Sequence, residues 1–158
     1  LQPVLPWTCN QWQVYNEYFQ WQPEYNYDSA SHVVKTGQTV YGMVTYNKTF
    51  NAYTMVNSVV ETGWSVTSTI PIQKGFESSE RLCEPQHFGG YKTYTDAYFV
   101  MEKDASNCKQ YSPDGQVTFY DIVIEWDGVQ RSPEWTTAVK DNVCNCRAHV
   151  MNETSIQV

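Results

Sequence analysis

Apolar and polar residues alternate along most of the chain with the two-residue period of a β-strand. In residues 39–46, one face carries Val, Gly, Val and Tyr, and the other carries Thr, Tyr, Met and Thr. The same pattern predicts strands over residues 13–21, 53–60 and 64–70, the first of them ended by Pro23. Because short turns join the strands over residues 39–46, 53–60 and 64–70, we expect these three to form an antiparallel meander.

The pattern lapses over residues 73–95, where glycine, proline and mixed charge predict an irregular surface connection that forms part of a binding rim. Strand patterns return at residues 97–103 and 117–126, and residues 142–158 supply one or two more. No stretch of ten residues combines a helical period with caps. The sequence therefore predicts one all-β domain over residues 1–158, two packed antiparallel sheets with little or no helix.

Composition and charge narrow the class of protein. The 12 tyrosines and 6 tryptophans favour pleated, half-buried surfaces, and most of them are expected in the core of the sandwich. A net charge of −7, with only 10 lysines and arginines, disfavours nucleic acid and anionic membrane surfaces as partners. No apolar run is long enough to cross a bilayer, so we expect a soluble protein.

Cysteines and glycosylation sequons indicate a secreted or extracellular protein, or one in an acidic secretory compartment. Asn47 and Asn152 each begin an Asn-x-Thr sequon and are the expected glycosylation sites. Disulfide bonding is expected of the five cysteines. Any one of them can be left out and the other four pair in three ways, giving 15 arrangements. The odd thiol is either free or bonded to another chain. The five are Cys9, Cys83, Cys108, Cys144 and Cys146.

Few patterns in the chain are typical of catalysis. Cys144, Cys146 and His149 offer three metal ligands within six residues, but a structural zinc site usually takes four, so a disulfide is favoured. We therefore predict no metal and no cofactor. Glu125 is interpreted as a solvated surface acid. Glu102 ends an apolar strand and can project from an aromatic-lined concave surface, the alternative being a strand-end glutamate in water.

Several segments resemble the eqolisins, the acid-acting glutamic peptidases. Residues 15–28, Tyr-Asn-Glu-Tyr-Phe-Gln-Trp-Gln-Pro-Glu-Tyr-Asn-Tyr-Asp, resemble the family's Trp-Tyr-Glu-Trp-Tyr-Pro-Asp-Tyr-x-Tyr-Asp, and residues 33–40 resemble its next strand entry. Residues 97–102, Ala-Tyr-Phe-Val-Met-Glu, are similar to Ala-Glu-Trp-Ile-Val-Glu, and residues 115–119, Gly-Gln-Val-Thr-Phe, to Gly-Thr-Val-Thr-Phe. The order and spacing agree over most of the chain.

The resemblance implies a concanavalin-like sandwich whose concave groove holds a catalytic glutamine and glutamate, here Gln2 and Glu102. The glutamate would act as general base and then general acid, and the glutamine amide would hold the water and stabilise the oxyanion. The implied substrate-binding residues are Tyr18, Gln20, Trp21 and Tyr98. Residues 82–84, Leu-Cys-Glu, resemble a family motif whose cysteine bonds upstream. Cys83 would then bridge to an N-terminal light chain, and this chain would be the heavy chain.

The chain also departs from the family pattern. Residues 3–6 are Pro-Val-Leu-Pro where the family has Thr-Gly-Ile-Asp, and Gln20, Tyr18 and Tyr98 replace Glu, Trp and Glu. Two hypotheses follow: a glutamic endopeptidase that takes a polypeptide substrate, or a lectin-like binding module that takes a glycan on an aromatic-lined face. Read without the resemblance, Gln2 is a terminal residue expected to fray, beside two prolines that disqualify a central strand.

Overall fold

The computed structural model describes residues 1–8, 10–20, 24–72, 96–102, 108–111, 113, 115–139 and 144–158. The chain forms two compact units, Leu1–Thr95 and Asp96–Val158, each of which is described by itself. The expected connection over residues 73–95 lies outside the described residues. In the described ranges, no helix is long and apolar enough to cross a membrane.

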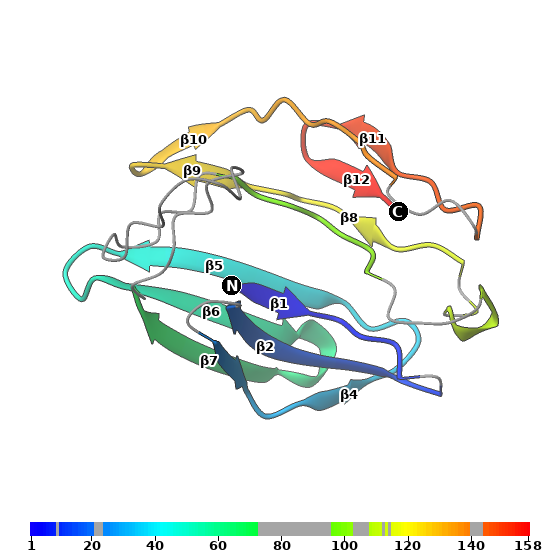
Figure 1. Ribbon diagram of the computed structural model, residues 1–158, viewed down its shortest axis with the longest axis horizontal. Coiled ribbons are helices and arrows are strands. Elements are labelled where there is room, and N and C mark those ends of the chain that lie inside the picture. The colour runs from blue at the N-terminus through cyan, green and yellow to red at the C-terminus, as the bar shows by residue number, and fades with distance from the viewer. Residues whose placement is uncertain are drawn as a thin grey trace. The chain divides into compact units, whose positions relative to one another are not determined.

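The first unit contains two antiparallel sheets (Figure 1). In one sheet the strand order is β1-β2-β3, and β4 also pairs with β2; the other is a meander of order β5-β6-β7. The predicted meander is therefore confirmed, as is the long strand ahead of it, whereas β1, β3 and β4 were not predicted. The bounds are β1 Gln2–Val4, β2 Trp12–Gln20, β3 Tyr25–Asp28, β4 His32–Val34, β5 Val40–Asn47, β6 Ala52–Val59 and β7 Trp64–Pro71, with a 3-10 turn at Val60–Thr62.

The two sheets of the first unit pack face to face, because each has an apolar inner face. Along β2 the side chains of Val14 and Tyr18 are buried, whereas the alternate residues Tyr15, Glu17 and Phe19 are only partly covered or exposed. Two apolar clusters join the sheets. One contains Val14, Val34 and Val59, and the other contains Tyr18, Met55 and Ile70. The predicted sandwich of antiparallel sheets is thus confirmed.

The second unit is built from short strands. They are β8 Thr118–Phe119, β9 Ile124–Trp126, β10 Val129–Arg131, β11 His149–Asn152 and β12 Ser155–Gln157, with a 3-10 turn at Cys108–Gln110. β9 and β10 form a hairpin, and β11, β12 and β8 form a three-stranded sheet. The strands predicted over residues 142–158 are β11 and β12. Ile122 and Ile156 are the buried apolar side chains of this unit among the described residues.

Two strand predictions in this unit are wrong. The strand expected over residues 117–126 is divided into β8 and β9, because Asp121 between them has a φ of 53°, which a continuous strand does not allow. The described residues 96–102 form no strand, although one was predicted over residues 97–103. Among the residues between Asp96 and Glu102, only Phe99 is partly covered, and it packs against Phe119 and Trp135.

Cysteine pairing is partly settled. Cys108 and Cys144 form a disulfide with an S–S distance of 2.07 Å, and the Cys146 thiol is free and donates to the Tyr111 hydroxyl at 3.4 Å. Cys9 and Cys83 lie outside the described residues. One disulfide reduces the 15 arrangements to three, and a free Cys146 leaves Cys9 as the one candidate within this chain to pair with Cys83.

We expect peptide mapping to recover Cys108 joined to Cys144, with Cys146 alkylated without reduction. Trypsin releases residues 104–109 and 141–147 as the two linked peptides. Since Cys144 and Cys146 share a peptide, the Cys146→Ser variant is the control and should keep the linked pair, whereas Cys144→Ser should lose it. A bridge of sequence separation 36 is expected to stabilise the fold by about 2–4 kcal/mol, measured by urea unfolding of Cys108→Ser. Recovery of a Cys108–Cys146 bridge would contradict the assignment.

Candidate functional site

Gln2 lies in strand β1 and faces the outer side of its sheet. Leu1 and Leu5 pack into the two apolar clusters, so the alternate residue Gln2 is directed to the opposite face. Among the described strands β1 is at the sheet edge, a position that tolerates Pro3. Gln2 therefore occupies a paired strand, where the sequence alone predicted a frayed end.

The side chain of Gln2 bonds to a glutamate on the next strand. Its Nε2 donates to Glu17 Oε2 at 2.7 Å, a short hydrogen bond. The β-ladder pairs Gln2 with Glu17 and Glu17 with Asp28, so an amide and two carboxyl groups form one row across β1, β2 and β3. An exposed face of the first unit thus presents an amide donor beside acid groups.

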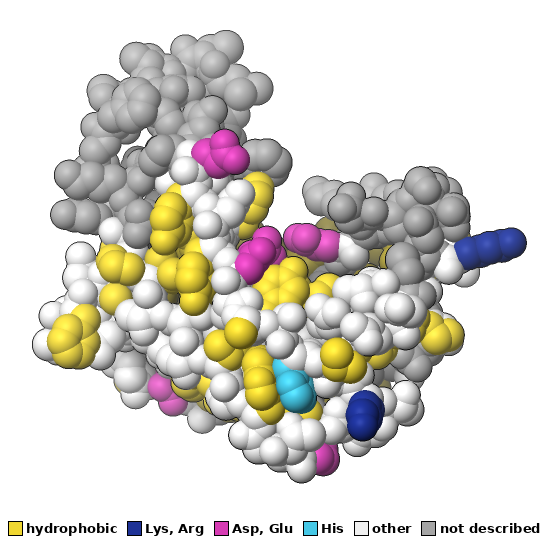
Figure 2. All heavy atoms as spheres, turned by 90° about the horizontal axis from the view of Figure 1, so that it is seen from below, with side chains coloured by type: hydrophobic (Ala, Val, Ile, Leu, Met, Phe, Trp, Pro, Cys, Tyr) yellow, Lys and Arg dark blue, Asp and Glu magenta, His cyan; other side chains and the backbone are white. Residues whose placement is uncertain are grey.

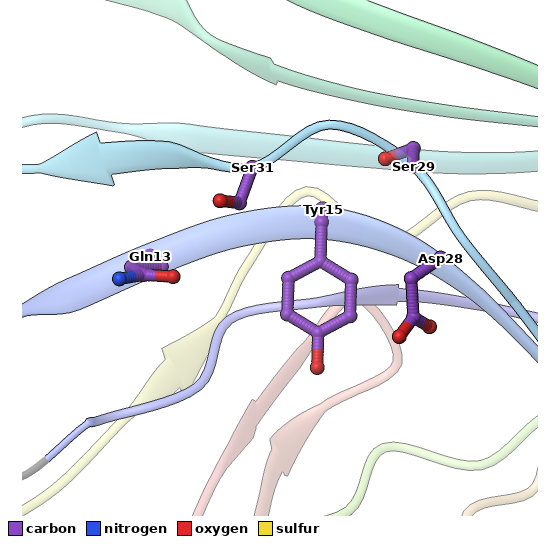
Figure 3. A pocket seen from close by; sticks show the side chains of 5 residues that line it. All are labelled: Gln13, Tyr15, Asp28, Ser29 and Ser31. Carbon is purple, nitrogen blue, oxygen red and sulfur yellow. The ribbon is translucent and has the colours of Figure 1, made fainter.

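A shallow polar depression of about 270 Å³ opens on the same unit (Figure 3). It is lined by Gln13, Tyr15, Asp28, Ser29 and Ser31. The Tyr15 ring and the Asp28 carboxyl project to the same side, whereas the two serines lie on the connection from β3 to β4, which runs beside β2. Ser29 is fixed there, because its Oγ accepts the Asn16 backbone N–H at 2.9 Å and donates to the Ala30 carbonyl at 3.0 Å.

Burial, together with the carboxylates of Glu17 and Asp28, raises the pKa of Tyr15 above its ordinary value. All three effects disfavour the negatively charged phenolate. The Tyr15 hydroxyl therefore stays a neutral donor and acceptor at any pH at which this face would bind a ligand.

This shift predicts a pH dependence of stability. Because the folded-state pKa of Tyr15 lies above the unfolded value near ~10, its contribution is fully present below ~10 and is lost as the pH rises through the folded pKa. We expect Tyr15→Phe to lose less unfolding free energy than the wild type between pH ~9.5 and ~11.5, measured by urea unfolding. Equal losses in the two proteins would contradict the prediction.

Two of the expected substrate-binding residues point into the sandwich. Tyr18 is 1% exposed and Gln20 is 2% exposed, and the Tyr18 hydroxyl donates to Gln20 Oε1 at 2.5 Å. Both share the inner face of β2 with Val14, so they do not form the face that carries Gln2. Trp21 lies outside the described residues.

The other two expected site residues belong to the second unit. Tyr98 is 79% exposed, and Glu102 is also exposed. Phe99 anchors this segment through aromatic contacts, with ring centroids 5.0 Å from Phe119 and 5.4 Å from Trp135. Glu102 is therefore a solvent-accessible carboxyl on a segment held at Phe99.

Glu17 is the residue of this face that the sequence comparison left without a role. The signal was present, because strict alternation along β2 puts Glu17 on the face opposite Val14 and Tyr18. The resemblance places Gln20, not Glu17, where the eqolisins have the glutamate of their aromatic segment, so the motif gave Glu17 no role.

Both sequon asparagines are exposed at turns. Asn47 Oδ1 accepts the backbone N–H groups of Thr49 and Phe50, and Asn152 Oδ1 accepts both the N–H and the hydroxyl of Thr154. Their side chains are thus on the surface, where attached glycans would have room.

The sulfur of Cys144 is bonded to Cys108, so it is not a metal ligand in this state. Within the described ranges, no group of three His, Cys, Asp or Glu side chains is arranged to hold a metal ion.

Together, the fold and the face define an all-β sandwich protein with a glutamine–carboxyl row on an outer sheet face. Its fold is that of the eqolisins: the structure is similar to the crystal structure of aspergilloglutamic peptidase from Aspergillus niger, with a TM-score of 0.55 and 18% sequence identity. The match covers 93% of this chain and 78% of that one. No protein-family model and no curated protein matches the sequence.

Proposed function

We propose that this chain is a secreted, acid-acting endopeptidase of the glutamic type, in which Gln2 and Glu102 form the catalytic pair. The observation that supports the proposal most directly is the hydrogen bond of 2.7 Å from Gln2 Nε2 to Glu17 Oε2, which holds the partly buried amide on the outer face of its sheet. A glutamine amide has two N–H donors and one acceptor oxygen. One donor is bound to Glu17, so the second remains to stabilise a developing oxyanion.

In the proposed reaction, the Glu102 carboxylate removes a proton from a water molecule as the water attacks the scissile carbonyl carbon. The Gln2 amide orients that water and donates to the oxyanion of the tetrahedral intermediate. Glu102 then returns the proton to the leaving amine as the C–N bond breaks. The similar fold of aspergilloglutamic peptidase supports this assignment of reaction type.

The charge of the surface is compatible with a polypeptide substrate. On the face drawn in Figure 2, the coloured lysine and arginine side chains stand singly among uncharged and hydrophobic ones. Acidic side chains are also visible in this view. Such a surface favours neutral or cationic segments over polyanions.

The direct test is digestion of a denatured protein by the purified chain. We expect cleavage at pH ~3–4 and little at pH 7, the dependence that an acid-acting peptidase would show. Metal chelators and serine-directed reagents should not inhibit it. Absence of cleavage at every acid pH tested would refute the proposal.

A second candidate, a lectin-like module, is favoured by the outer face of the β5–β7 sheet. These three strands contain no charged residue, and hydroxyl side chains form cross-strand rows such as Thr45, Thr54 and Thr69. Tyr41, 49% exposed, stands on the same face and offers an aromatic surface to a neutral sugar. A glycan array at neutral pH with no ligand would remove this candidate.

The proposed light chain can be tested by mass spectrometry of the native protein. With Cys108 bonded to Cys144 and Cys146 free, the candidate disulfide partners of Cys83 are Cys9 and a cysteine of a second chain. Release of a small polypeptide on reduction would support the light chain, whereas a Cys9–Cys83 peptide pair would exclude it.

A further inference from the structure

We propose that Gly42 and Asn57 form a seat that positions the Gln2–Glu17 pair from the inner side of the sheet. The two residues are cross-strand partners on β5 and β6. The catalytic role of Gln2 rests on the proposed function, whereas the contacts of Gly42 and Asn57 with β1 and β2 do not depend on any activity.

Asn57 is hydrogen-bonded to both strands that carry Gln2 and Glu17. Its Nδ2 donates to the Val4 carbonyl on β1 at 3.2 Å and to the Tyr15 carbonyl on β2 at 3.0 Å. Val4 and Tyr15 are themselves paired across the ladder, two pairs along from Gln2 and Glu17. One carboxamide therefore ties β1 to β2 within two residues of the catalytic amide.

Gly42 provides the space into which β1 packs. A Cβ atom at this position would lie 2.9 Å from Pro3 Cβ and 3.2 Å from Pro3 Cγ, closer than packed carbon atoms approach. Pro3 lies between Gln2 and Val4, so any side chain at position 42 would push directly on β1.

Asn57 is poorly explained as a stabilising residue. It is fully buried, and its Oδ1 finds no hydrogen-bond partner among the described residues, which costs about 1–3 kcal/mol. Each bond from its Nδ2 offsets only part of that cost. A buried amide kept at such a cost is suited to fixing geometry, and catalytic groups must be held to within about 0.5 Å.

Asn16 is a matched control for Asn57. It is equally buried, and its Oδ1 also lacks a partner among the described residues. Its Nδ2, however, donates to the Met55 carbonyl, the Val66 carbonyl and Ser68 Oγ, all on β6 and β7. Asn16 pairs with Pro3 through its backbone, but its side chain donates only to the other sheet, so Asn16→Ala should cost similar stability while the side-chain bond to β1 stays in place.

The seat is tested by NMR of the Gln2 side-chain amide, assigned by its loss in Gln2→Ala. In Asn57→Ala, we expect the Gln2 side-chain resonances to shift and the β1 backbone amides to exchange faster. Asn16→Ala should leave the Gln2 resonances in place. Equal changes in both variants, or none in Asn57→Ala, would overturn the proposal.

Kinetics at acid pH supply the second readout. They are measured at a temperature at which each variant is still folded. Displacement of the amide should lower kcat roughly tenfold to a hundredfold in Asn57→Ala with KM nearly unchanged, while Asn16→Ala stays within about twofold of wild type. An inactive wild type would refute the peptidase, whereas the NMR comparison would still decide the seat.

If Asn57→Ala does not fold, Asn57→Asp replaces it, since the aspartic acid is isosteric and, when protonated, keeps one O–H donor. It should give an intermediate shift of Gln2 at acid pH. The wild type offers a test that needs no variant: the Asn57 side-chain protons should show nuclear Overhauser contacts to Val4 and Tyr15. Absence of these contacts overturns the seat.

Discussion

Replacing Glu102 with glutamine is expected to abolish acid proteolysis. The variant keeps the size and hydrogen-bonding capacity of the side chain but cannot exchange a proton with water or the leaving amine. General acid–base catalysis contributes roughly 10²–10⁴-fold to the rate, so kcat should fall by at least that range. The measurement is cleavage of a denatured protein or a peptide substrate at pH ~3–4.

Exposure makes this variant easy to interpret. Because Glu102 is exposed, its substitution should change the unfolding free energy by no more than about 0.5 kcal/mol, so lost activity would not reflect unfolding. Glu125→Gln is the matched control, since it removes another exposed carboxyl of the same unit. Full activity in Glu102→Gln, or equal loss in Glu125→Gln, would contradict the assignment.

The first sandwich could be predicted because its signals are local. Alternation in residues 39–46, 53–60 and 64–70, separated by short turns, is sufficient for a meander in which neighbours in sequence pair. The same alternation also indicated which side chains of β2 point into the sandwich. Tyr18 and Gln20 have the parity of Val14, which is buried, so an interior position followed from the pattern.

Features that depend on partners distant in sequence were not predictable. Residues 97–102 have the composition of a strand, yet a strand also requires a neighbouring backbone, and no described segment pairs with them. Asp121 divides the segment from 117 to 126 by its positive φ, which composition does not reveal. Strand β1 was missed since its prolines suggested fraying. Pairing with β2 and the Asn57 carboxamide hold it in place.

In the candidate site, too, local motifs could be recognised from the sequence, whereas contacts between distant residues could not. Gln2 and Glu102 were selected by short motifs, whereas Glu17 emerged only when the register placed it opposite Gln2. The disulfide between Cys108 and Cys144 is likewise a fact of three-dimensional proximity that spacing alone left among 15 arrangements.

Replacing Gln2 with alanine should lower kcat by roughly 10²–10³-fold, the range observed when one oxyanion donor is removed. The variant loses the amide that donates to Glu17 Oε2 at 2.7 Å, and with it the donor proposed to bind the oxyanion. Since Glu17 is only partly buried, water can replace the lost bond to its carboxylate, and the fold should survive.

The distinguishing readout is the split between kcat and KM. A group that binds only in the transition state lowers kcat and kcat/KM equally and leaves KM unchanged, whereas a group that merely holds substrate raises KM. Gln130→Ala, an exposed strand glutamine of the second unit, controls for the loss of a surface amide and should keep wild-type kinetics. A higher KM with unchanged kcat in Gln2→Ala would move Gln2 from catalysis to substrate binding and leave Glu102 without its proposed partner.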